Sequence, residues 1–260
     1  MNNVIDIRSN DGSIVKLEAH SFLPSVVERA REYAKQGYPD RYVVFAEHQH
    51  ATTATGNKAD SEEIEEGLYM SLILRPSLFP SQASLLGAMS ATAMAMALSE
   101  HTEKSLGLGW TTDLYCEGEK IGSVIIEGKL DNFTSYEYII ITFCARLSKT
   151  SFPPRLTDMV RKVFESENTS ISMIIARNVL NKFFRFYATV KSSTKFMSNY
   201  LEYFVLRDTV IKYDTGTKKK SCKVIGVDNK TGELIIEYPK GKFTHVKSQK
   251  LVTIPRKIKL

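Results

Sequence analysis

The sequence contains few cysteines, and their placement excludes two common uses of this residue. Cys116, Cys144 and Cys222 are the three cysteines among 260 residues. Because their number is odd and long intervals separate them, they argue against a disulfide framework and against a clustered zinc site. Cysteines used in this way are typical of a reducing compartment, so we expect a cytoplasmic location.

The sequence also lacks a long hydrophobic run. Its most apolar stretch, residues 85–98, is shorter than the roughly 20 residues that span a bilayer and is rich in alanine and serine. The first 11 residues are polar and include acids, which predicts no secretion signal. Together with a hydrophobic content of 43%, these features predict a soluble protein with no membrane partner.

Histidine is scarce as well, and positive charge is in moderate excess. Five histidines accompany a formal net charge of +6 and a pI near 9.0. The excess suits an anionic partner, but the lysines are dispersed and form no nucleic-acid-binding stripe in the sequence. Nucleic acid or an acidic partner would bind at the basic segments 218–220 and 256–259, although charge runs of this length are usually solvated.

One predicted hairpin near the middle of the chain brings its only tryptophan together with a carboxylate and a lysine. The Glu-Gly pair at 117–118 predicts a two-residue turn between two strands. The resulting register places Tyr115 opposite Lys120 and Leu114 opposite Ile121. The side chains that carry chemistry are therefore expected on one face of this hairpin.

Asp113 follows Trp110 in this hairpin and becomes the diagonal neighbour of Lys120 on one face of the sheet. Two interpretations remain open from the residues alone. One is an ordinary surface ion pair, which contributes little to stability. The other is a phosphate site, in which Lys120 neutralises phosphate charge and Asp113 holds Mg²⁺, a cation that prefers carboxylate and phosphate oxygens.

Hydrophobic periodicity predicts alternating strands and helices along the first 205 residues. Before the hairpin we expect strands at 4–7, 14–17, 42–46 and 68–74, a helix at 26–36 capped by Ser25, and a helix from Ser81 to about Ser99. After the hairpin we expect a strand at 136–143 and helices at 156–166, 170–187 and 196–205. The polar residues 47–66 predict a long loop.

From residue 208 the pattern changes to short strands separated by turns. These strands are expected at 210–213, 222–227, 234–238 and 244–246. We therefore predict two domains, a larger one over residues 1–205 and a small barrel-like β domain over residues 206–260.

In combination, the segments resemble a biotin protein ligase. The resemblance is carried by their order and spacing, over VFAEHQ at 44–49, GLYMSLILRP at 67–76, WTTDLY at 110–115, KIGSVIIE at 120–127 and the turns at 226–228 and 232–234. It implies an α/β fold of the α+β type, a mixed sheet with packed helices, and an SH3-like β-barrel at residues 206–260. We expect no helix-turn-helix ahead of the first strand.

The resemblance also implies a chemistry and partners. Enzymes of this family join biotin to ATP with Mg²⁺ to form biotinyl-adenylate, and then pass biotin to a lysine of a carrier domain. Carried over residue by residue, Lys120 and Asp113 would be catalytic, with Asp113 also the metal ligand. The ligand-binding residues would be Gln49, Thr55, Lys58, Trp110, Gly122 and Arg146. A carrier domain or another protein, and a second copy of the chain in a homodimer, are the expected partners.

The departures from the family pattern concentrate on the residues that handle ATP. The family's phosphate loop is rich in glycine and arginine, but residues 52–58 read TTATGNK and keep only the charge of Lys58. Four glutamates follow between 62 and 66. A glycine-lined nucleotide groove aligns with residues 142–146, where Phe143 and larger neighbours are expected to obstruct a ligand.

Three functional hypotheses follow. In the first, the chain is a ligase relative that has lost most or all catalysis and works by binding a ligand or a partner protein. In the second, it is a divergent but working ligase that uses Asp113, Lys120 and Lys58, with Arg75 or Arg146 as further replacement cations. In the third, it is a structural subunit whose basic segments contact an acidic or nucleic-acid partner.

Overall fold

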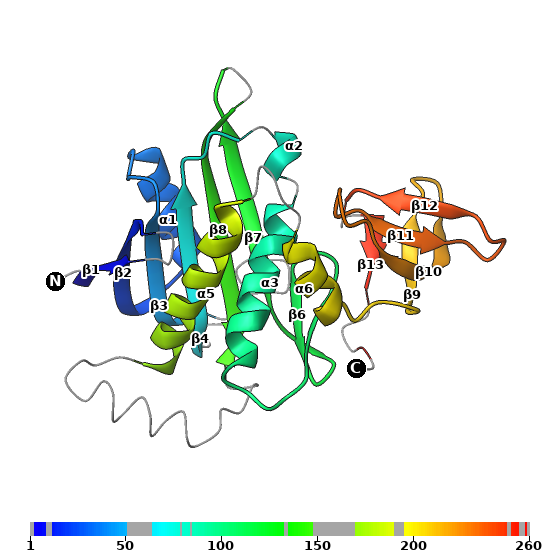
Figure 1. The fold of residues 1–260 in the computed structure, drawn as a ribbon, viewed down its shortest axis with the longest axis horizontal. Coiled ribbons are helices and arrows are strands. Elements are labelled where there is room, and N and C mark those ends of the chain that lie inside the picture. Colours follow the sequence, from blue (N-terminus) through cyan, green and yellow to red (C-terminus); the bar gives the residue numbers. More distant parts are fainter. Residues whose placement is uncertain are drawn as a thin grey trace.

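A computed structural model describes residues 3–8, 12–50, 64–78, 80–83, 85–132, 135–147, 170–189, 195–248, 251–254 and 258. Figure 1 shows a large sheet with helices on its faces and a small sheet formed by the C-terminal strands. Among the described helices, none has the length and apolar character required to cross a membrane.

Eight strands form the large sheet in the order β1-β2-β3-β4-β8-β7-β6-β5. The strands β2 and β3 run parallel, and the other neighbouring pairs are antiparallel. The bounds are β1 Asn3–Arg8, β2 Ile14–Leu23, β3 Tyr42–His50, β4 Ile64–Leu74, β5 Leu106–Leu108, β6 Asp113–Cys116, β7 Glu119–Leu130 and β8 Tyr136–Arg146. The predicted mixed sheet is therefore confirmed, and β5 was not foreseen.

Helices cover both faces of the large sheet and divide its core in two. On one face lies α1, Val26–Lys35, and on the other lie α3, Leu86–Ser99, α5, Ile171–Tyr187, and α6, Phe196–Tyr203 (Figure 1). The face under α1 is smaller and includes several tyrosines, whereas the face under α3 and α5 is almost wholly aliphatic and aromatic. Removing these side chains from water is the main favourable contribution to folding.

The predicted helix after Ser25 is confirmed, and its local chemistry explains its start. The Ser25 hydroxyl accepts a hydrogen bond from the backbone N–H of Glu28, and Gly37 follows the end with a positive φ of 83°. Ser170 caps α5 in the same way, through the N–H of Met173. Both helices therefore begin where the sequence places a short hydroxyl side chain.

Two predictions of local structure were wrong in extent. Residues 47–66 are not all loop, because β3 continues to His50 and β4 begins at Ile64, where the two strands pair with each other. Pairing with a neighbouring strand satisfies the backbone even where the side chains are polar. The helix expected from Ser81 is divided into α2, Pro80–Ala83, and α3, with Leu85 preceding α3. The predicted helix at 156–166 lies outside the described residues.

The small sheet has five antiparallel strands in the order β12-β11-β10-β9-β13. Their bounds are β9 Val210–Asp214, β10 Lys219–Val227, β11 Leu234–Glu237, β12 Phe243–Val246 and β13 Val252–Thr253. The predicted strands are thus confirmed. Within the described part of the chain no pairing joins β12 to β13, so the sheet is open and the expected closed barrel is not observed.

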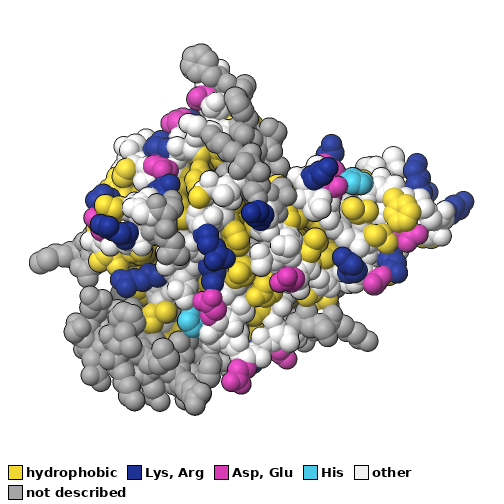
Figure 2. Space-filling model, in the orientation of Figure 1, with side chains coloured by type: hydrophobic (Ala, Val, Ile, Leu, Met, Phe, Trp, Pro, Cys, Tyr) yellow, Lys and Arg dark blue, Asp and Glu magenta, His cyan; other side chains and the backbone are white. Residues whose placement is uncertain are grey.

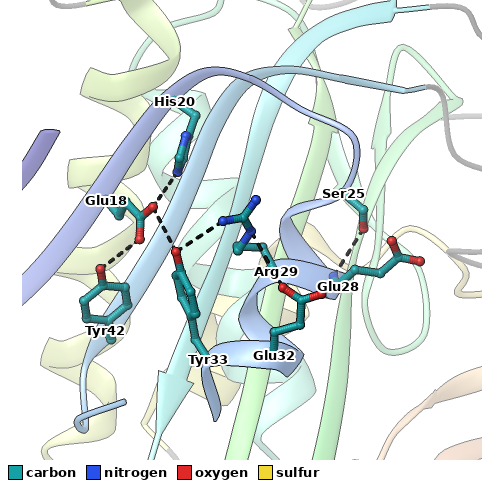
Figure 3. A network of polar contacts seen from close by, with 8 residues as sticks. All are labelled: Glu18, His20, Ser25, Glu28, Arg29, Glu32, Tyr33 and Tyr42. Atoms are coloured by element: carbon teal, nitrogen blue, oxygen red, sulfur yellow. Dashed lines mark hydrogen bonds and ion pairs between the residues drawn. The ribbon is translucent and has the colours of Figure 1, made fainter. Parts of the chain in front are cut away.

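A buried polar network ties α1 to the strands beneath it (Figure 3). Glu18 on β2 is 1% exposed, and its carboxylate accepts hydrogen bonds from Tyr42 at 2.8 Å and from Tyr33 at 3.2 Å. The ring of His20 lies 2.8 Å from the same carboxylate. Burial, followed by the hydrogen bond to Glu18, raises the pKa of Tyr42, so this hydroxyl stays a donor.

Candidate functional site

The hairpin formed by β6 and β7 carries the predicted site, and its turn is confirmed. Glu117 and Gly118 have positive φ angles of 50° and 79°, as a two-residue hairpin turn requires. Tyr115 pairs with Lys120 as predicted, but Leu114 pairs with Gly122 rather than with Ile121. One extra residue in β7 forms a bulge here, and bulges are a common means of redirecting side chains beside a site.

The bulged hairpin brings Asp113 and Lys120 into direct contact. Lys120 Nζ lies 2.7 Å from Asp113 Oδ1, and the two side chains are 18% and 19% exposed. Behind the pair lie Tyr115 and Tyr200, whose pKa values are raised by burial and then by the Asp113 charge. This ion pair is therefore mostly enclosed by protein, yet solvent still reaches both charges.

Strand β8 supports the lysine from the other side. The Arg146 guanidinium donates a hydrogen bond from Nη2 to the backbone oxygen of Lys120 at 2.8 Å. This bond places a permanent positive charge beside the backbone of Lys120, because arginine does not lose its proton in proteins. Arg146, which the resemblance assigns to ligand binding, thus lies beside Lys120, which it assigns to catalysis.

A single row of side chains continues from the ion pair across the sheet. Asp113 pairs with Ser123, Ser123 with Cys144, and Cys144 with Tyr69. Ser123 and Cys144 are small and partly exposed, whereas Tyr69 is only 2% exposed. The surface of the sheet beside Asp113 and Lys120 is therefore formed by the small side chains of Ser123 and Cys144, and the ring of Tyr69 bounds it. We call this surface the floor of the site.

The expected obstruction by Phe143 does not occur on this face. Alternation along β8 turns Phe143 to the helix layer, where its ring lies 6.2 Å from that of Phe183 on α5 in an edge-to-face arrangement. Cys144, its smaller neighbour, faces the row that starts at Asp113. The prediction was wrong because it did not assign Phe143 to one of the two opposite faces of the strand.

Gln49 lies at the same end of the sheet, below the start of α1. Its side chain is 2% exposed, and its Oε1 accepts a hydrogen bond from the backbone N–H of Val26 at 3.0 Å. The positive end of the α1 dipole is therefore held at the edge from which residues 51–63 continue. Ligand contact by Gln49 remains a prediction, while its role as a helix cap is observed.

Gly122 has a structural explanation that does not involve a ligand. A Cβ atom at this position would lie 2.1 Å from the backbone oxygen of Cys144, which no side chain tolerates. Gly67 on β4 is restricted in the same way by the backbone oxygen of Ala145, at 2.5 Å. The two glycines allow β4 and β7 to approach β8 closely, so the sheet end that carries Lys120 and Arg146 is tightly packed.

Trp110 connects the site to the small sheet. Its ring is 2% exposed, and its Nε1–H donates to the backbone oxygen of Gly232 at 2.7 Å. At the tip of the same hairpin, the N–H of Ile258 donates to the oxygen of Gly118 at 2.9 Å. Two contacts with C-terminal residues thus hold the hairpin that presents Asp113 and Lys120.

Comparisons with known proteins agree with this arrangement. No protein-family model matches the chain. Over 153 residues, 58% of its length, it is 24% identical to the bifunctional ligase/repressor BirA of Bacillus subtilis, and the match spans 47% of that protein. The chain therefore spans about half the length of this curated relative.

Solved structures extend the similarity to nearly the whole chain. The biotin protein ligase of Aquifex aeolicus has a TM-score of 0.64 and 19% identity, with 92% of this chain and 98% of that chain covered. The same ligase has been solved in complex with biotin and ATP. The chain therefore shares the fold of the biotin protein ligases.

One further neighbour shows that this fold also occurs without an assigned activity. A biotin protein ligase-like protein of unknown function from Silicibacter sp. TM1040 has a TM-score of 0.63 and 12% identity, covering 90% of this chain and 94% of that chain. Similarity at this level shows the fold alone, so the chemistry has to be argued from the side chains present in the site.

The predicted roles of Thr55 and Lys58 in ligand binding, and of Asp113 in metal binding, stay predictions. Thr55 and Lys58 lie outside the described residues. No group of three or more metal-binding side chains occurs among the residues that the structure describes. Asp113 offers one carboxylate, already paired with Lys120, so the Mg²⁺ assignment remains a prediction that depends on phosphate oxygens from a substrate.

Arg75 is excluded as a replacement cation for the site. Its guanidinium donates to the backbone oxygens of Ala34, Tyr38 and Glu137, at the opposite end of α1 from Gln49. The side chain therefore caps the last turn of α1 and contributes to the fold.

Sequence reasoning missed the floor of the site and the contact with the small sheet. Ser123 and Tyr69 follow from strand register once the β7 bulge is known, but a bulge of this kind leaves no clear signal in the sequence. The hydrogen bond from Trp110 to Gly232 spans 122 positions and has no local signature at all.

Proposed function

We propose that this chain is a biotin protein ligase relative that binds biotin or a closely related carboxylic acid, with little or no remaining catalysis. The observation that supports the proposal best is the Asp113–Lys120 pair, held at a partly exposed sheet end beside Arg146. A ligand carboxylate that enters this end can pair with Lys120, and the positive charge of Arg146 offsets part of its repulsion with Asp113.

The groups around the pair suit the carboxylate end of such a ligand. Lys120 and Arg146 supply positive charge, and the N-terminal end of α1 points its dipole at the same edge of the sheet. The small side chains of Ser123 and Cys144 leave space on the floor beside them. The apolar part of the ligand would lie over this floor, against the ring of Tyr69.

Loss of adenylate formation is proposed from the sequence between β3 and β4. Transfer to the α-phosphate of ATP requires cationic and N–H groups that stabilise the developing charge. Residues 52–58 contain no arginine, and a lysine cannot reproduce the two-pronged contact of an arginine with phosphate. The glutamates between 62 and 66 add repulsion toward a triphosphate.

The second candidate is a divergent active ligase, and one observation favours it. Arg146 lies next to Lys120, so a permanent cation is available where the family uses a glycine-lined strand end. In this alternative, biotin and ATP are substrates, Mg²⁺ is held by Asp113 and phosphate oxygens, and a carrier domain receives biotin. An SH3-like character of the small sheet, a domain boundary near residue 205, and a homodimer belong to both candidates as proposals.

Calorimetric titration with biotin tests the binding proposal. The wild-type chain should bind biotin. Lys120→Ala should weaken the affinity about a hundredfold, because the biotin carboxylate loses its charge-assisted contact with Lys120, which contributes about 2 to 3 kcal/mol. Lys129→Ala is the matched control, since Lys129 lies on the same strand as Lys120, nine positions away, and also forms an ion pair, with Glu137 on β8.

The control variant should bind biotin as the wild type does. If neither the wild type nor Lys129→Ala binds biotin, the binding proposal is wrong. If Lys120→Ala binds biotin as tightly as the wild type, the ligand carboxylate is held elsewhere and the role of Lys120 is refuted.

A further inference from the structure

The C-terminal region differs sharply in charge from the rest of the chain. Residues 206–260 contain 14 of the 35 lysines and arginines but only 5 of the 29 aspartates and glutamates, a net charge of +9. The remaining −3 of the overall +6 belongs to residues 1–205. An asymmetry of this size is typical of a region that binds an anionic partner.

Strand connectivity separates the two ends of the small sheet. The β10–β11 turn carries Gly232, which accepts the hydrogen bond from Trp110, so this end faces the large sheet. In an antiparallel meander the β9–β10 and β11–β12 turns must lie at the other end. Figure 1 shows the β11–β12 turn at the side of the small sheet farthest from the large sheet.

The lysines of this region gather at the distal end. Two turns and the strand start beside them carry five lysines, Lys218, Lys219, Lys220, Lys240 and Lys242. None of the five forms an ion pair with a carboxylate among the described residues, and two carboxylates, Asp214 and Glu237, lie close to them in the strands. Figure 2 shows dark-blue side chains gathered along this end of the small sheet.

Aromatic side chains lie among these lysines. Phe243 is 55% exposed at the start of β12, immediately after the β11–β12 turn. Tyr213 and Tyr238 contact each other edge to face, with ring centroids 6.3 Å apart, and Lys220 Nζ lies 5.1 Å from the centre of the Tyr238 ring. The Phe243 ring is therefore exposed beside the lysines, where a flat apolar group of a partner can stack on it.

One of these rings, that of Tyr238, borders a hollow in the surface. It has a volume of about 340 Å³ and is lined by Val210, Ser221, Cys222, Lys223, Glu237, Tyr238 and Pro239. Val210 is 61% exposed, which adds a second apolar contact at the rim. A hollow of this size, with a lysine and an aromatic ring in its wall, accommodates one planar base and its sugar.

We propose that the distal end of the small sheet, defined by the five lysines together with Tyr238 and Phe243, binds single-stranded nucleic acid. The lysines meet the phosphate backbone, and the rings stack on unpaired bases. An acidic protein would use the lysines but would leave Phe243 without a stacking partner, and a duplex hides its bases. The proposal does not rest on ligand binding at Lys120, which lies on the other sheet.

Fluorescence anisotropy with a labelled 12-nucleotide oligo-dT, at several salt concentrations and on the full chain, tests this proposal. The wild type should bind, and the logarithm of its affinity should fall linearly with the logarithm of the salt concentration. The combined variant Lys218→Ala, Lys219→Ala, Lys240→Ala and Lys242→Ala should reduce that slope by about 0.7 for each lysine that contacts a phosphate.

Phe243→Ala separates stacking from charge. It should weaken oligo-dT binding about tenfold and leave the salt slope unchanged, because stacking carries no net charge. The matched control is Lys35→Ala with Lys129→Ala, two exposed lysines of the large sheet and its helix, which should bind oligo-dT as the wild type does. Melting curves should be alike for all variants, since the replaced side chains are exposed.

Competition by unlabelled oligo-dT, a duplex and polyglutamate decides the identity of the partner. Unlabelled oligo-dT should displace the probe, whereas a duplex of the same length and polyglutamate should compete at least ten times less well. Equal competition by polyglutamate, with no effect of Phe243→Ala, would overturn the proposal in favour of an acidic protein partner. Absence of oligo-dT binding at about 100 mM salt would also overturn the proposal. So would a loss of binding in the control variant equal to that in the combined lysine variant.

Discussion

Two polar clusters occupy one face of the large sheet, and they differ in how completely the protein encloses them. At Glu18 the carboxylate is 1% exposed and is surrounded by the hydroxyls of Tyr33 and Tyr42 and the ring of His20 (Figure 3). At Asp113 and Lys120 the side chains remain 18% and 19% exposed. The first cluster is sealed and holds α1 on the sheet, and the second can exchange one partner for a ligand.

The two clusters also differ in how the sequence around them has changed relative to the ligase pattern. Around the sealed cluster, the strand and helix residues keep the fold of the relatives. By contrast, residues 52–58 contain no arginine, which departs from the arginine-rich phosphate loop that the ligase resemblance implies. The chain thus shares the fold of the ligases, while the residues expected to handle ATP depart from the pattern that the resemblance implies.

The largest effect is expected from breaking the sealed cluster. Glu18→Ala removes the acceptor of two buried tyrosine hydroxyls and should lower the free energy of unfolding by about 3 kcal/mol. Urea denaturation measures this change, with Glu32→Ala as the control, because the Glu32 side chain is 66% exposed and forms only a 3.9 Å ion pair with Arg29. A loss below 1 kcal/mol for Glu18→Ala would show that the network does not hold the fold.

A smaller effect is expected from loosening the contact between the exposed cluster and the small sheet. Trp110→Phe removes the N–H that bonds to Gly232 and leaves a buried carbonyl without this donor. The free energy of unfolding should fall by about 2 kcal/mol, part of it from the smaller ring. Phe204→Leu is a suitable comparison, since Phe204 is also buried, at 8% exposed, but its side chain has no hydrogen-bond donor.

The measurement for Trp110→Phe is thermal unfolding followed by circular dichroism, together with protease digestion of the native protein. Cleavage between the two sheets should become faster in Trp110→Phe than in Phe204→Leu. Equal cleavage rates would show that the contact with Gly232 does not hold the small sheet in place.

The smallest effect on stability is expected at the exposed pair itself. Lys120→Ala should change the free energy of unfolding by less than about 1 kcal/mol, because partly solvated ion pairs contribute little to folding. The same urea titration used for Glu18→Ala provides the value. A loss as large as that of Glu18→Ala would mean that the pair is part of the scaffold, and the contrast between the clusters would disappear.

Much of the fold could be predicted because its signals are local. The turn at Glu117 and Gly118, the capping serine before α1 and the strands of the small sheet each depend on a few neighbouring residues. Helix and strand boundaries at Ser81 and His50 were wrong, because pairing and packing with distant segments decided them.

Less of the candidate site could be predicted, for a physical reason. The pairing of Asp113 with Lys120 was expected from alternation and is observed at 2.7 Å. The face of the sheet on which Phe143 lies depends on the register of β8 with its neighbouring strands. The contact of Trp110 with Gly232 depends on how the two sheets pack together. Neither is encoded in a short stretch of sequence.

The most direct test of the central claim is an assay for pyrophosphate release from ATP and Mg²⁺ in the presence of biotin, with biotin binding measured on the same protein sample. The account predicts that biotin binds in a Lys120-dependent way and that no pyrophosphate is released above the background of the chain without biotin. Biotin-dependent pyrophosphate release that disappears in Lys120→Ala would contradict the account and establish a working ligase.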